Sequence, residues 1–577
     1  MSVSEPSPLT LSLDTSNPGV VSLTLDQGQS VLAVAHAMIA QAGSQPVKVP
    51  IIVQSNGTTL ASASITVAPT NPPLPTMPGQ SYPSDAWLAQ LAPYLDAYGF
   101  HDFNALAVAN GYTIIYLGAQ AGDCPDINTA QTKVAALRAA GRNVCVQIRR
   151  GTTLTAAQVN QDLMSSGASP ALPVIWMATP DVANARPVLQ GRLGVCWPKG
   201  VVQNVVVAGL DFYDPLADPS NAQFAGAKQS AQASGLYLVN PQPANHILIE
   251  DCRVQYMGTG IDIEAIGNSP MSTIIIWQCV IANNYGGRDG IYSQFVIDLC
   301  IVNCLFAHNG WMPASGKWAG YPKNIFTHNL YLQEWTSAYV TAACLANNPQ
   351  TRVIGLFSAE AAAEGIEQRS GGLLASSLFL ANPIAGFLGP TGGAAQIENC
   401  VVDGGGGLFD LTIGGPTMPR GWGLFLNAVS TATVSDVLAI NKPDKVNVGF
   451  AIGVQCFNTD TNQNVPTNAT LTGLAVNDWT GPSFQVTTGT PGTLAFSQCV
   501  LNGYSAAGVM AAPQYVDPTR TVAKYAATLG IAGVTDAASL LAYAVANQRR
   551  ANWDVRLTAP LINAWINQGF SVSQGAA

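Results

Sequence analysis

Two carboxylates, Asp262 and Glu264, stand two residues apart in the phrase Gly-Ile-Asp-Ile-Glu. If this phrase forms a β-strand, alternate side chains leave the same face, and the two Cα atoms lie about 6.5–7 Å apart. Two close carboxylates raise the pKa of one of them, which supplies a general acid beside a base or nucleophile. Glycosidases hold such a pair either about 5–5.5 Å or about 6.5–9.5 Å apart, so we expect the acid/base core of a glycosidase here. The alternative is a solvated strand face without catalytic function.

Two further carboxylates belong to the same pattern. Asp289 precedes the next strand-like phrase, and Glu367 lies in a later one, Gly-Ile-Glu-Gln-Arg. Only 10% of the residues are charged, against about 25% in an ordinary protein. In a chain so poor in charge, several acids on one face indicate a functional site. Asp289 and Glu367 are therefore further catalytic candidates, with Glu367 as the alternative acid/base carboxylate.

A second set of residues suits elimination rather than hydrolysis. His328 and Tyr331 could abstract a proton beside a uronate carboxylate, and Arg369 could hold that carboxylate. The alternatives are structural, because His328 could be a turn residue bonded to the backbone, and Arg369 could pair with Glu367 or Glu334. The sequence therefore keeps a lyase open beside a hydrolase.

An aromatic, glycine-rich excursion over residues 308–327 interrupts the strand-like phrases. It carries Trp311, Trp318 and Tyr321, and Trp335 ends the phrase that follows. Aromatic faces stack on sugar rings, so these four side chains are candidates for substrate binding. The alternative is that the aromatics pack on one another over the edge of the fold.

A recurring strand-like phrase must position these residues. In each copy an aliphatic residue points inward, and the positions after it alternate outward and inward. The inward aliphatics are Leu236, Ile261, Ile291, Leu330, Ile366 and Leu424. Two outward columns follow, of which the first is Tyr237, Asp262, Tyr292, Tyr331, Glu367 and Phe425, and the second Val239, Glu264, Gln294, Gln333, Arg369 and Asn427. We expect Tyr292, Gln294, Tyr331 and Gln333 to bind substrate beside the acids.

A second phrase recurs between the strand-like ones, with a polar residue, then Cys or a small residue, then two apolar residues. Copies include Asp251-Cys252-Arg253-Val254, Gln278-Cys279-Val280-Ile281, Asn303-Cys304-Leu305-Phe306, Asn399-Cys400-Val401-Val402 and Gln498-Cys499-Val500-Leu501. With looser copies at Gly209, Cys344, Ser377, Asp436 and Gly473, successive copies lie between 23 and 43 residues apart. A repeat of this length predicts a solenoid, in which each coil buries its apolar face against its neighbours. The 11 cysteines are then expected to be free thiols inside the solenoid.

The coil phrases resemble those of the right-handed, single-stranded parallel β-helix of the pectate-lyase-like superfamily. The runs His328-Asn329-Leu330-Tyr331-Leu332 and Gly365-Ile366-Glu367-Gln368-Arg369-Ser370-Gly371-Gly372 carry the resemblance together with the repeat. This superfamily includes polysaccharide lyases, glycoside hydrolases and phage tailspike depolymerases. The sequence has neither the Asn-x-Asp, Asp-Asp and Gly-His-Gly set of polygalacturonases nor the calcium-binding aspartate cluster of pectate lyases. We therefore predict no metal and no cofactor.

The chain divides into five predicted segments. Residues 1–68 alternate apolar and polar positions as a small β-sandwich does, and residues 69–83 form a proline-rich linker. Residues 84–169 are predicted to be a mixed α/β segment that caps the solenoid, residues 170–515 the β-helix of about ten coils, and residues 516–577 a C-terminal helical cap. The expected fold class is therefore an all-β solenoid with a small module at each end.

Composition limits the partners. The net charge is -9 and no basic face is evident, which argues against nucleic acid. The apolar runs are too short to cross a membrane, and the first residues do not resemble a secretion signal.

These features and the resemblance predict a depolymerase of bacterial exo- or capsular polysaccharide, extracellular or virion-associated, plausibly a tailspike. A polysaccharide lyase and a non-catalytic glycan-binding adhesin are the alternatives. A homo-oligomer (a trimer if a tailspike) or attachment to a particle through residues 1–68 would fit this reading.

Overall fold

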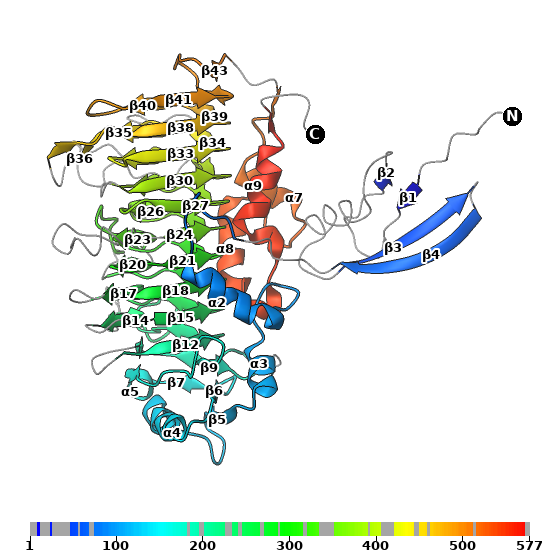
Figure 1. The fold of residues 1–577 in the computed structure, drawn as a ribbon, viewed down its shortest axis with the longest axis vertical. Helices are drawn as coiled ribbons and strands as arrows, with labels where there is room; N and C mark the ends of the chain where they lie inside the picture. The colour runs from blue at the N-terminus through cyan, green and yellow to red at the C-terminus, as the bar shows by residue number, and fades with distance from the viewer. Residues whose placement is uncertain are drawn as a thin grey trace.

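Three long sheets of parallel strands run along the molecule in the computed structural model (Figure 1). The structure describes residues 9–11, 23–25, 47–55, 58–67, 74–181, 185–195, 201–224, 234–240, 245–265, 270–286, 289–314, 320–333, 351–389, 393–405, 421–442, 449–458, 462–511 and 515–571. Consecutive strands visit the three sheets in turn, so hydrogen-bonded neighbours within a sheet come from successive coils. This is the predicted right-handed, single-stranded parallel β-helix.

Two sheets have 13 strands and one has 11. Sheet 1 consists of β5 (Thr113–Leu117), β6 (Val144–Ile148), β9 (Val174–Ala178), β12 (Gln203–Ala208), β15 (Asn245–Glu250), β18 (Ser272–Trp277), β21 (Leu299–Val302), β24 (Arg352–Ile354), β27 (Gly372–Ala375), β30 (Ala394–Glu398), β33 (Thr431–Ser435), β38 (Asn468–Thr472) and β41 (Leu494–Ser497). Sheet 2 consists of β7 (Thr153–Leu154), β10 (Val188–Leu189), β13 (Asp211–Tyr213), β16 (Arg253–Gln255), β19 (Val280–Ala282), β22 (Leu305–Ala307), β25 (Phe357–Ala359), β28 (Leu378–Leu380), β31 (Val401–Asp403), β34 (Leu438–Lys442), β39 (Ala475–Trp479), β42 (Cys499–Val500) and β43 (Val509–Met510). Sheet 3 consists of β8 (Gln161–Leu163), β11 (Leu193–Val195), β14 (Ser234–Asn240), β17 (Thr259–Ala265), β20 (Ile291–Gln294), β23 (Leu330–Gln333), β26 (Glu364–Gln368), β29 (Ile384–Leu388), β32 (Trp422–Asn427), β35 (Ile452–Gln455) and β40 (Phe484–Val486).

The solenoid begins earlier than residue 170, the start that the sequence predicted. Strands β5, β6, β7 and β8 already pair in register with the coils that follow them. Their phrases lack the cysteine slot, which is why the repeat pattern did not include them. The segment that we expected to be a separate cap therefore contributes the first strands of all three sheets.

The cysteine phrase marks the tight corner between sheet 1 and sheet 2. Its polar residue takes a left-handed backbone conformation, with φ of 53° at Asp251, 49° at Gln278 and 49° at Asn303. Only glycine and short polar residues adopt this conformation at low cost. The chain turns at the polar residue, and the cysteine after it points into the core.

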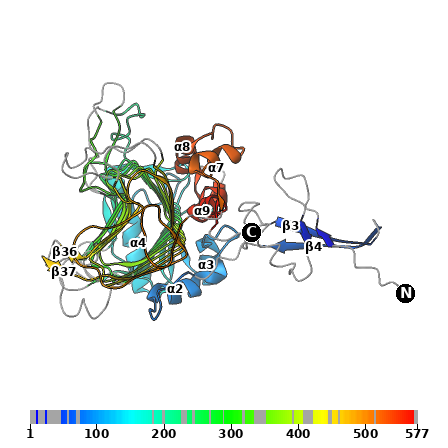
Figure 2. The same ribbon diagram turned by 90° about the horizontal axis from the view of Figure 1, so that it is seen from above.

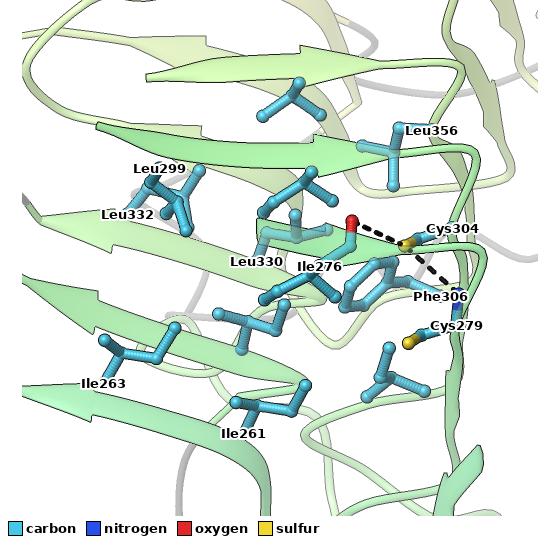
Figure 3. Close-up of a cluster of buried hydrophobic side chains, with 14 of the residues drawn as sticks. Ile261, Ile263, Ile276, Cys279, Leu299, Cys304, Phe306, Leu330, Leu332 and Leu356 are labelled. Carbon is cyan, nitrogen blue, oxygen red and sulfur yellow. Dashed lines mark hydrogen bonds between the residues drawn. The ribbon is translucent and has the colours of Figure 1, made fainter. Parts of the chain in front are cut away.

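The described cysteines are free and buried, as predicted. In Figure 3 the thiol of Cys304 donates to the carbonyl of Ile276 and accepts from the backbone N–H of Cys279. The cysteines share the core with the inward aliphatics of sheet 3, such as Ile261 and Leu330. Cys196 and Cys344 lie outside the described residues.

Helices cover two of the three sheets (Figure 2). Helices α2 (Pro83–Leu91) and α3 (Phe103–Ala109), joined by η1 (Ala92–Tyr94), pack their apolar side chains on sheet 1. Helices α7 (Val522–Thr528), α8 (Ala537–Asn547) and α9 (Ala559–Asn567), with η2 (Arg550–Asn552) and η3 (Val555–Leu557), cover sheet 2 and are the predicted C-terminal helical part. Helix α4 (Ile127–Ala139) closes the apolar core at the first coil, and α5 (Ala156–Val159) follows it. Among the described residues no helix packs on sheet 3, and outward side chains such as Tyr292, Tyr331 and Glu367 are partly exposed.

The two helical covers are tied together by Arg550. Its guanidinium donates from Nε to the carboxylate of Asp96 at 2.8 Å and from Nη1 to the carbonyl oxygen of His101 at 3.1 Å. Its backbone N–H donates to Asp251 on the solenoid at 2.9 Å. The C-terminal segment thus returns along sheet 2 and meets the N-terminal helices.

The remaining strands pair outside the solenoid. Strands β1 (Leu9–Leu11) and β2 (Leu23–Leu25) are antiparallel, as are β3 (Val47–Ser55) and β4 (Thr58–Val67). The pairs β36 (Phe457–Asn458) with β37 (Gln463–Asn464) and β44 (Tyr515–Val516) with β45 (Phe570–Ser571) are also antiparallel. A sandwich over residues 1–68 stays a prediction, since much of that range lies outside the described residues. None of the described helices is long and apolar enough to cross a membrane.

Candidate active site

The two outward columns expected from the sequence stack on sheet 3. Asp262 pairs with Tyr292 on the next coil, Tyr292 pairs with Tyr331, and Tyr331 pairs with Glu367. In the second column Glu264 pairs with Gln294, and Gln294 with Gln333. The predicted strand register is therefore correct, and these side chains share the uncovered face.

A third column beside them brings three charged residues into contact. Asp289, His328 and Glu364 each stand two residues before the inward aliphatic of their coil, so the parallel pairing stacks them. Nδ1 of His328 lies 2.8 Å from Oδ1 of Asp289, and Nε2 lies 2.8 Å from Oε2 of Glu364. Nε2 is also 3.4 Å from Oε2 of Glu367, which belongs to the first column. His328 therefore joins three carboxylates, and it is not merely a turn residue bonded to the backbone.

His328 is a buried imidazolium. Burial by itself lowers the pKa of His328, but the charges of Glu364 and Asp289, and hydrogen bonds to both, outweigh it and place the pKa well above 6.5. Only 4% of the side chain is exposed. The raised pKa favours the protonated ring, which is a poor general base. The contacts of His328 hold the surrounding carboxylates in place, and a catalytic role for it stays a prediction.

Glu367 is the titratable group that reaches solvent. Burial raises the pKa of Glu367, His328 lowers it and Glu364 raises it again, with a result of about 7. Its side chain is 14% exposed, and its Oε1 lies 3.8 Å from Nη1 of Arg369. A carboxyl group that is partly protonated at neutral pH can give or take a proton there. Glu367 therefore has the environment of a general acid/base.

Tyr331 and Arg369 flank this carboxyl group. Nη1 of Arg369 donates to the hydroxyl of Tyr331 at 3.1 Å, and the rings of Tyr331 and His328 lie 4.8 Å apart. Burial, reinforced by the charge of Glu367, raises the pKa of Tyr331 to about 12. The phenol keeps its proton at neutral pH and can donate a hydrogen bond to a bound substrate.

The neighbouring coil adds polar groups beside Tyr331. The hydroxyl of Tyr292 donates to Oε1 of Gln294 at 2.9 Å, and the rings of Tyr292 and Tyr331 lie 5.6 Å apart. Gln333, next to Gln294 in the second column, is half-buried. These side chains lie where we expected substrate-binding residues, and their roles stay predictions.

Asp262 and Glu264 lie on the same face but away from the His328 cluster. Asp262 is 7% exposed and accepts from the hydroxyl of Ser234 at 3.4 Å, while Glu264 is half-buried. Three coil steps separate Asp262 from Glu367, which is about 14 Å at the strand spacing of a sheet. The two acids therefore cannot share one glycosidic bond with Glu367, and their own catalytic role stays a prediction.

Glu364 is the residue of the cluster that the sequence did not single out. Strict alternation assigns Glu364 and Glu367 to opposite faces of a strand, yet both contact His328. The usable signal was the position of Glu364, two residues before an inward aliphatic, where Asp289 and His328 also stand. Ligand atoms of Glu364, Glu367 and His328 lie within 4.8 Å of one another, so a metal ion could bind only by displacing the histidine proton.

The described aromatics of the 308–327 excursion pack on the corner of the fold. Nε1 of Trp311 donates to the carbonyl of Glu360 at 2.6 Å, and Nζ of Lys323 lies 4.5 Å from its ring centre. The Tyr321 ring lies 5.9 Å from that of Tyr285. Both rings thus contact the fold, and a substrate contact by Trp311 or Tyr321 stays a prediction. Trp318 and Trp335 lie outside the described residues.

No protein-family model matches the sequence, and a comparison with curated proteins finds no match. Among solved structures, an alginate lyase from Paenibacillus is similar at 12% identity and a TM-score of 0.32, over 66% of this chain and 99% of that one. The A-module of a mannuronan C-5 epimerase from Azotobacter vinelandii is similar at 12% identity and a TM-score of 0.32, over 66% and 96%. A tailspike capsular polysaccharide depolymerase from Acinetobacter baumannii bacteriophage Fri1 is similar at 13% identity and a TM-score of 0.30, over 65% and 56%. At this level of similarity, function must be argued from the residues of the chain itself.

Proposed function

We propose that the protein is a polysaccharide-acting enzyme that cleaves a bacterial exo- or capsular polysaccharide by glycoside hydrolysis. The observation that carries the proposal is Glu367, a solvent-reaching carboxyl group with a pKa of about 7 on the uncovered sheet. The long face of sheet 3 suits a polymer, which would lie along the coils. Residues 1–68 would attach the enzyme to a particle or cell surface, and the enzyme would act outside the cell or on a virion.

In this proposal Glu367 protonates the glycosidic oxygen as the sugar–oxygen bond breaks. Glu364 is the nearest carboxylate, and its oxygen lies within 4.8 Å of that of Glu367, close to the about 5–5.5 Å of retaining glycosidases. It would stabilise the positive charge that develops at the anomeric carbon until a water molecule adds there and gives its proton back to the Glu367 carboxylate. His328 and Asp289 fix the position of Glu364, and Tyr331 donates a hydrogen bond to the substrate.

A lyase is the second candidate, and one contact favours it. Arg369 and the Tyr331 hydroxyl lie 3.1 Å apart, so a uronate carboxylate held by Arg369 would bring the sugar to Tyr331. The Glu367 carboxylate would then take the proton beside the uronate carboxylate, the double bond would form as the glycosidic C–O bond breaks, and Tyr331 would protonate the leaving oxygen. A glycan-binding adhesin without catalysis is the third possibility, with the same face as its binding surface.

Analysis of the products separates these functions. The protein is incubated with purified bacterial capsular and exopolysaccharides, and chain length, reducing ends and ultraviolet absorbance are followed. Hydrolysis shortens the polymer and creates reducing ends without new absorbance, whereas elimination also creates an unsaturated, absorbing sugar. Polymer that keeps its length but is retained by the protein would identify an adhesin.

A further inference from the structure

The column of Glu367 becomes aromatic one coil beyond it, and the column of Glu364 becomes aromatic two coils beyond Glu364. Glu367 pairs with Phe387 on β29, and Phe387 pairs with Phe425 on β32. In the column of Glu364, Ile384 on β29 pairs with Trp422 on β32. Phe450 occupies the same column one coil further on. We call Phe387, Trp422, Phe425 and Phe450 the aromatic platform. It continues the candidate active site along the solenoid axis.

The four rings form one connected surface. Trp422 stacks on Phe450 with ring centres 5.2 Å apart and an angle of 22° between planes. Phe425 lies 5.1–5.3 Å from Phe387, Trp422 and Phe450. Phe425 and Phe450 are 3% exposed, whereas Phe387 and Trp422 are half-buried. Phe425 and Phe450 are therefore the buried part of the cluster, and Phe387 and Trp422 expose part of their surface to solvent.

Two glycines allow these rings to lie against the backbone. A Cβ at Gly449 would lie 1.9 Å from the ring of Trp422, and a Cβ at Gly453 would lie 2.2 Å from the ring of Phe450. Any side chain at either position would therefore push a ring off the sheet. The positions of Trp422 and Phe450 therefore depend on these two glycines.

We propose that the aromatic platform binds a pyranose ring of the polysaccharide next to the bond that Glu367 protonates. This inference rests on the proposed function and adds where the polymer lies and what the adjoining sugar is. One face of a pyranose presents C–H groups, which pack against the electron-rich face of an aromatic ring. Because Phe387 and Phe425 offer no hydrogen bonds, a charged sugar would lose hydration there without compensation. The sugar on the platform is therefore uncharged, and the polymer runs across coils β26 to β32.

The test uses Glu367→Gln protein, which should bind glycan without cutting it, on a printed array of bacterial capsular and exopolysaccharides. The array includes dextran as a neutral polymer and alginate as a polyuronate. We expect Trp422→Ala to weaken binding of the retained glycan about tenfold, the effect of losing one stacked ring. Trp422→Phe should restore most of the binding. Tyr116→Ala, which removes an exposed ring at the far end of the solenoid, is the matched control and should bind as the parent does.

The outcomes separate this inference from the proposed function. Unchanged binding by Trp422→Ala and by Phe387→Ala, in a protein whose wild type still cleaves the glycan, would overturn the platform alone. If the protein retains alginate and this retention depends on Trp422, the inference that the sugar on the platform is uncharged is wrong. Wild-type protein that neither cuts nor retains any polysaccharide would overturn both. If Trp422→Ala fails to fold by circular dichroism, Phe387→Ala decides, because Phe387 lies at the edge of the cluster.

Discussion

Arg352 on sheet 1 and Arg369 beside sheet 3 lie on the same turn of the solenoid, both facing away from the core, but their surroundings differ. Arg352 is fully buried under α2, where it donates to Ser84 at 2.8 Å and Asp85 at 2.7 Å and lies over the ring of Tyr82. Arg369 is half-buried and reaches the hydroxyl of Tyr331 on the uncovered face. Where a helix covers the sheet, an outward charged side chain is buried in contacts that stabilise the fold. Where no helix covers it, the charged side chain can contact a substrate.

The acids show the same contrast. Asp403 on sheet 2 is 1% exposed and accepts from the backbone N–H of Val522, at the start of α7. Glu367 on sheet 3 keeps contact with solvent. The position of a carboxylate in the coil therefore does not determine its role, whereas the cover above it does.

The largest expected effect is loss of activity on the uncovered face. Glu367→Gln removes the acid while nearly preserving shape, so the rate should fall about 100- to 10,000-fold without loss of folding. Glu264→Gln and Asp262→Asn, on the same face three coils away, test the competing acid pair. If Glu264→Gln or Asp262→Asn abolishes cleavage while Glu367→Gln is active, the catalytic pair is the one first expected from the sequence.

On a covered face the corresponding change should cost stability. Arg352→Ala leaves Asp298 buried near Ser84 and removes the contact with Asp85, whose side chain is 42% exposed. Breaking a buried charged pair costs about 3–5 kcal/mol, and the exposure of Asp85 places this case near 3 kcal/mol. Denaturant unfolding measures the loss. Arg369→Ala should be nearly neutral in the same experiment, and an equal cost for the two would contradict the comparison.

The pH profile should depend on Arg369. As a general acid, Glu367 acts when protonated, so the rate should fall as the pH rises through about 7. Arg369 lowers the pKa of Glu367, so Arg369→Met should raise that pKa and move the falling limb to higher pH. Rates measured from pH 5 to 9 would show the shift. A limb that stays in place would mean that another group sets it.

The smallest effect should be at the core thiols. Cys252, Cys279 and Cys304 are about 1% exposed, and burial raises the pKa of the first two well above 9. A thiol reagent should leave them unmodified in the native protein and modify them after denaturation. Rapid labelling under native conditions would place the cysteine slots outside the core.

The repeat made the register of sheet 3 predictable, because Asp262, Tyr292 and Tyr331 follow inward aliphatics at one fixed distance. The cover of the other sheets was not predictable in the same way. Residues such as Trp87 and Ile562 pack on strands that are far away in the sequence. No local sequence pattern indicates which of the three sheets each helix will cover. Glu364 was missed because strand alternation fails near a corner, where the backbone turns.

Arg550 gives the molecule a mechanical property that its coils alone would lack. A solenoid held only by neighbour contacts frays from its ends and unwinds coil by coil under tension. Here Arg550 links the C-terminal helices to Asp96, before the first coil, and to Asp251, in the middle of the solenoid. In an optical trap the protein should therefore resist to a high force and then yield in one large step, whereas Arg550→Ala should yield in a series of smaller ones.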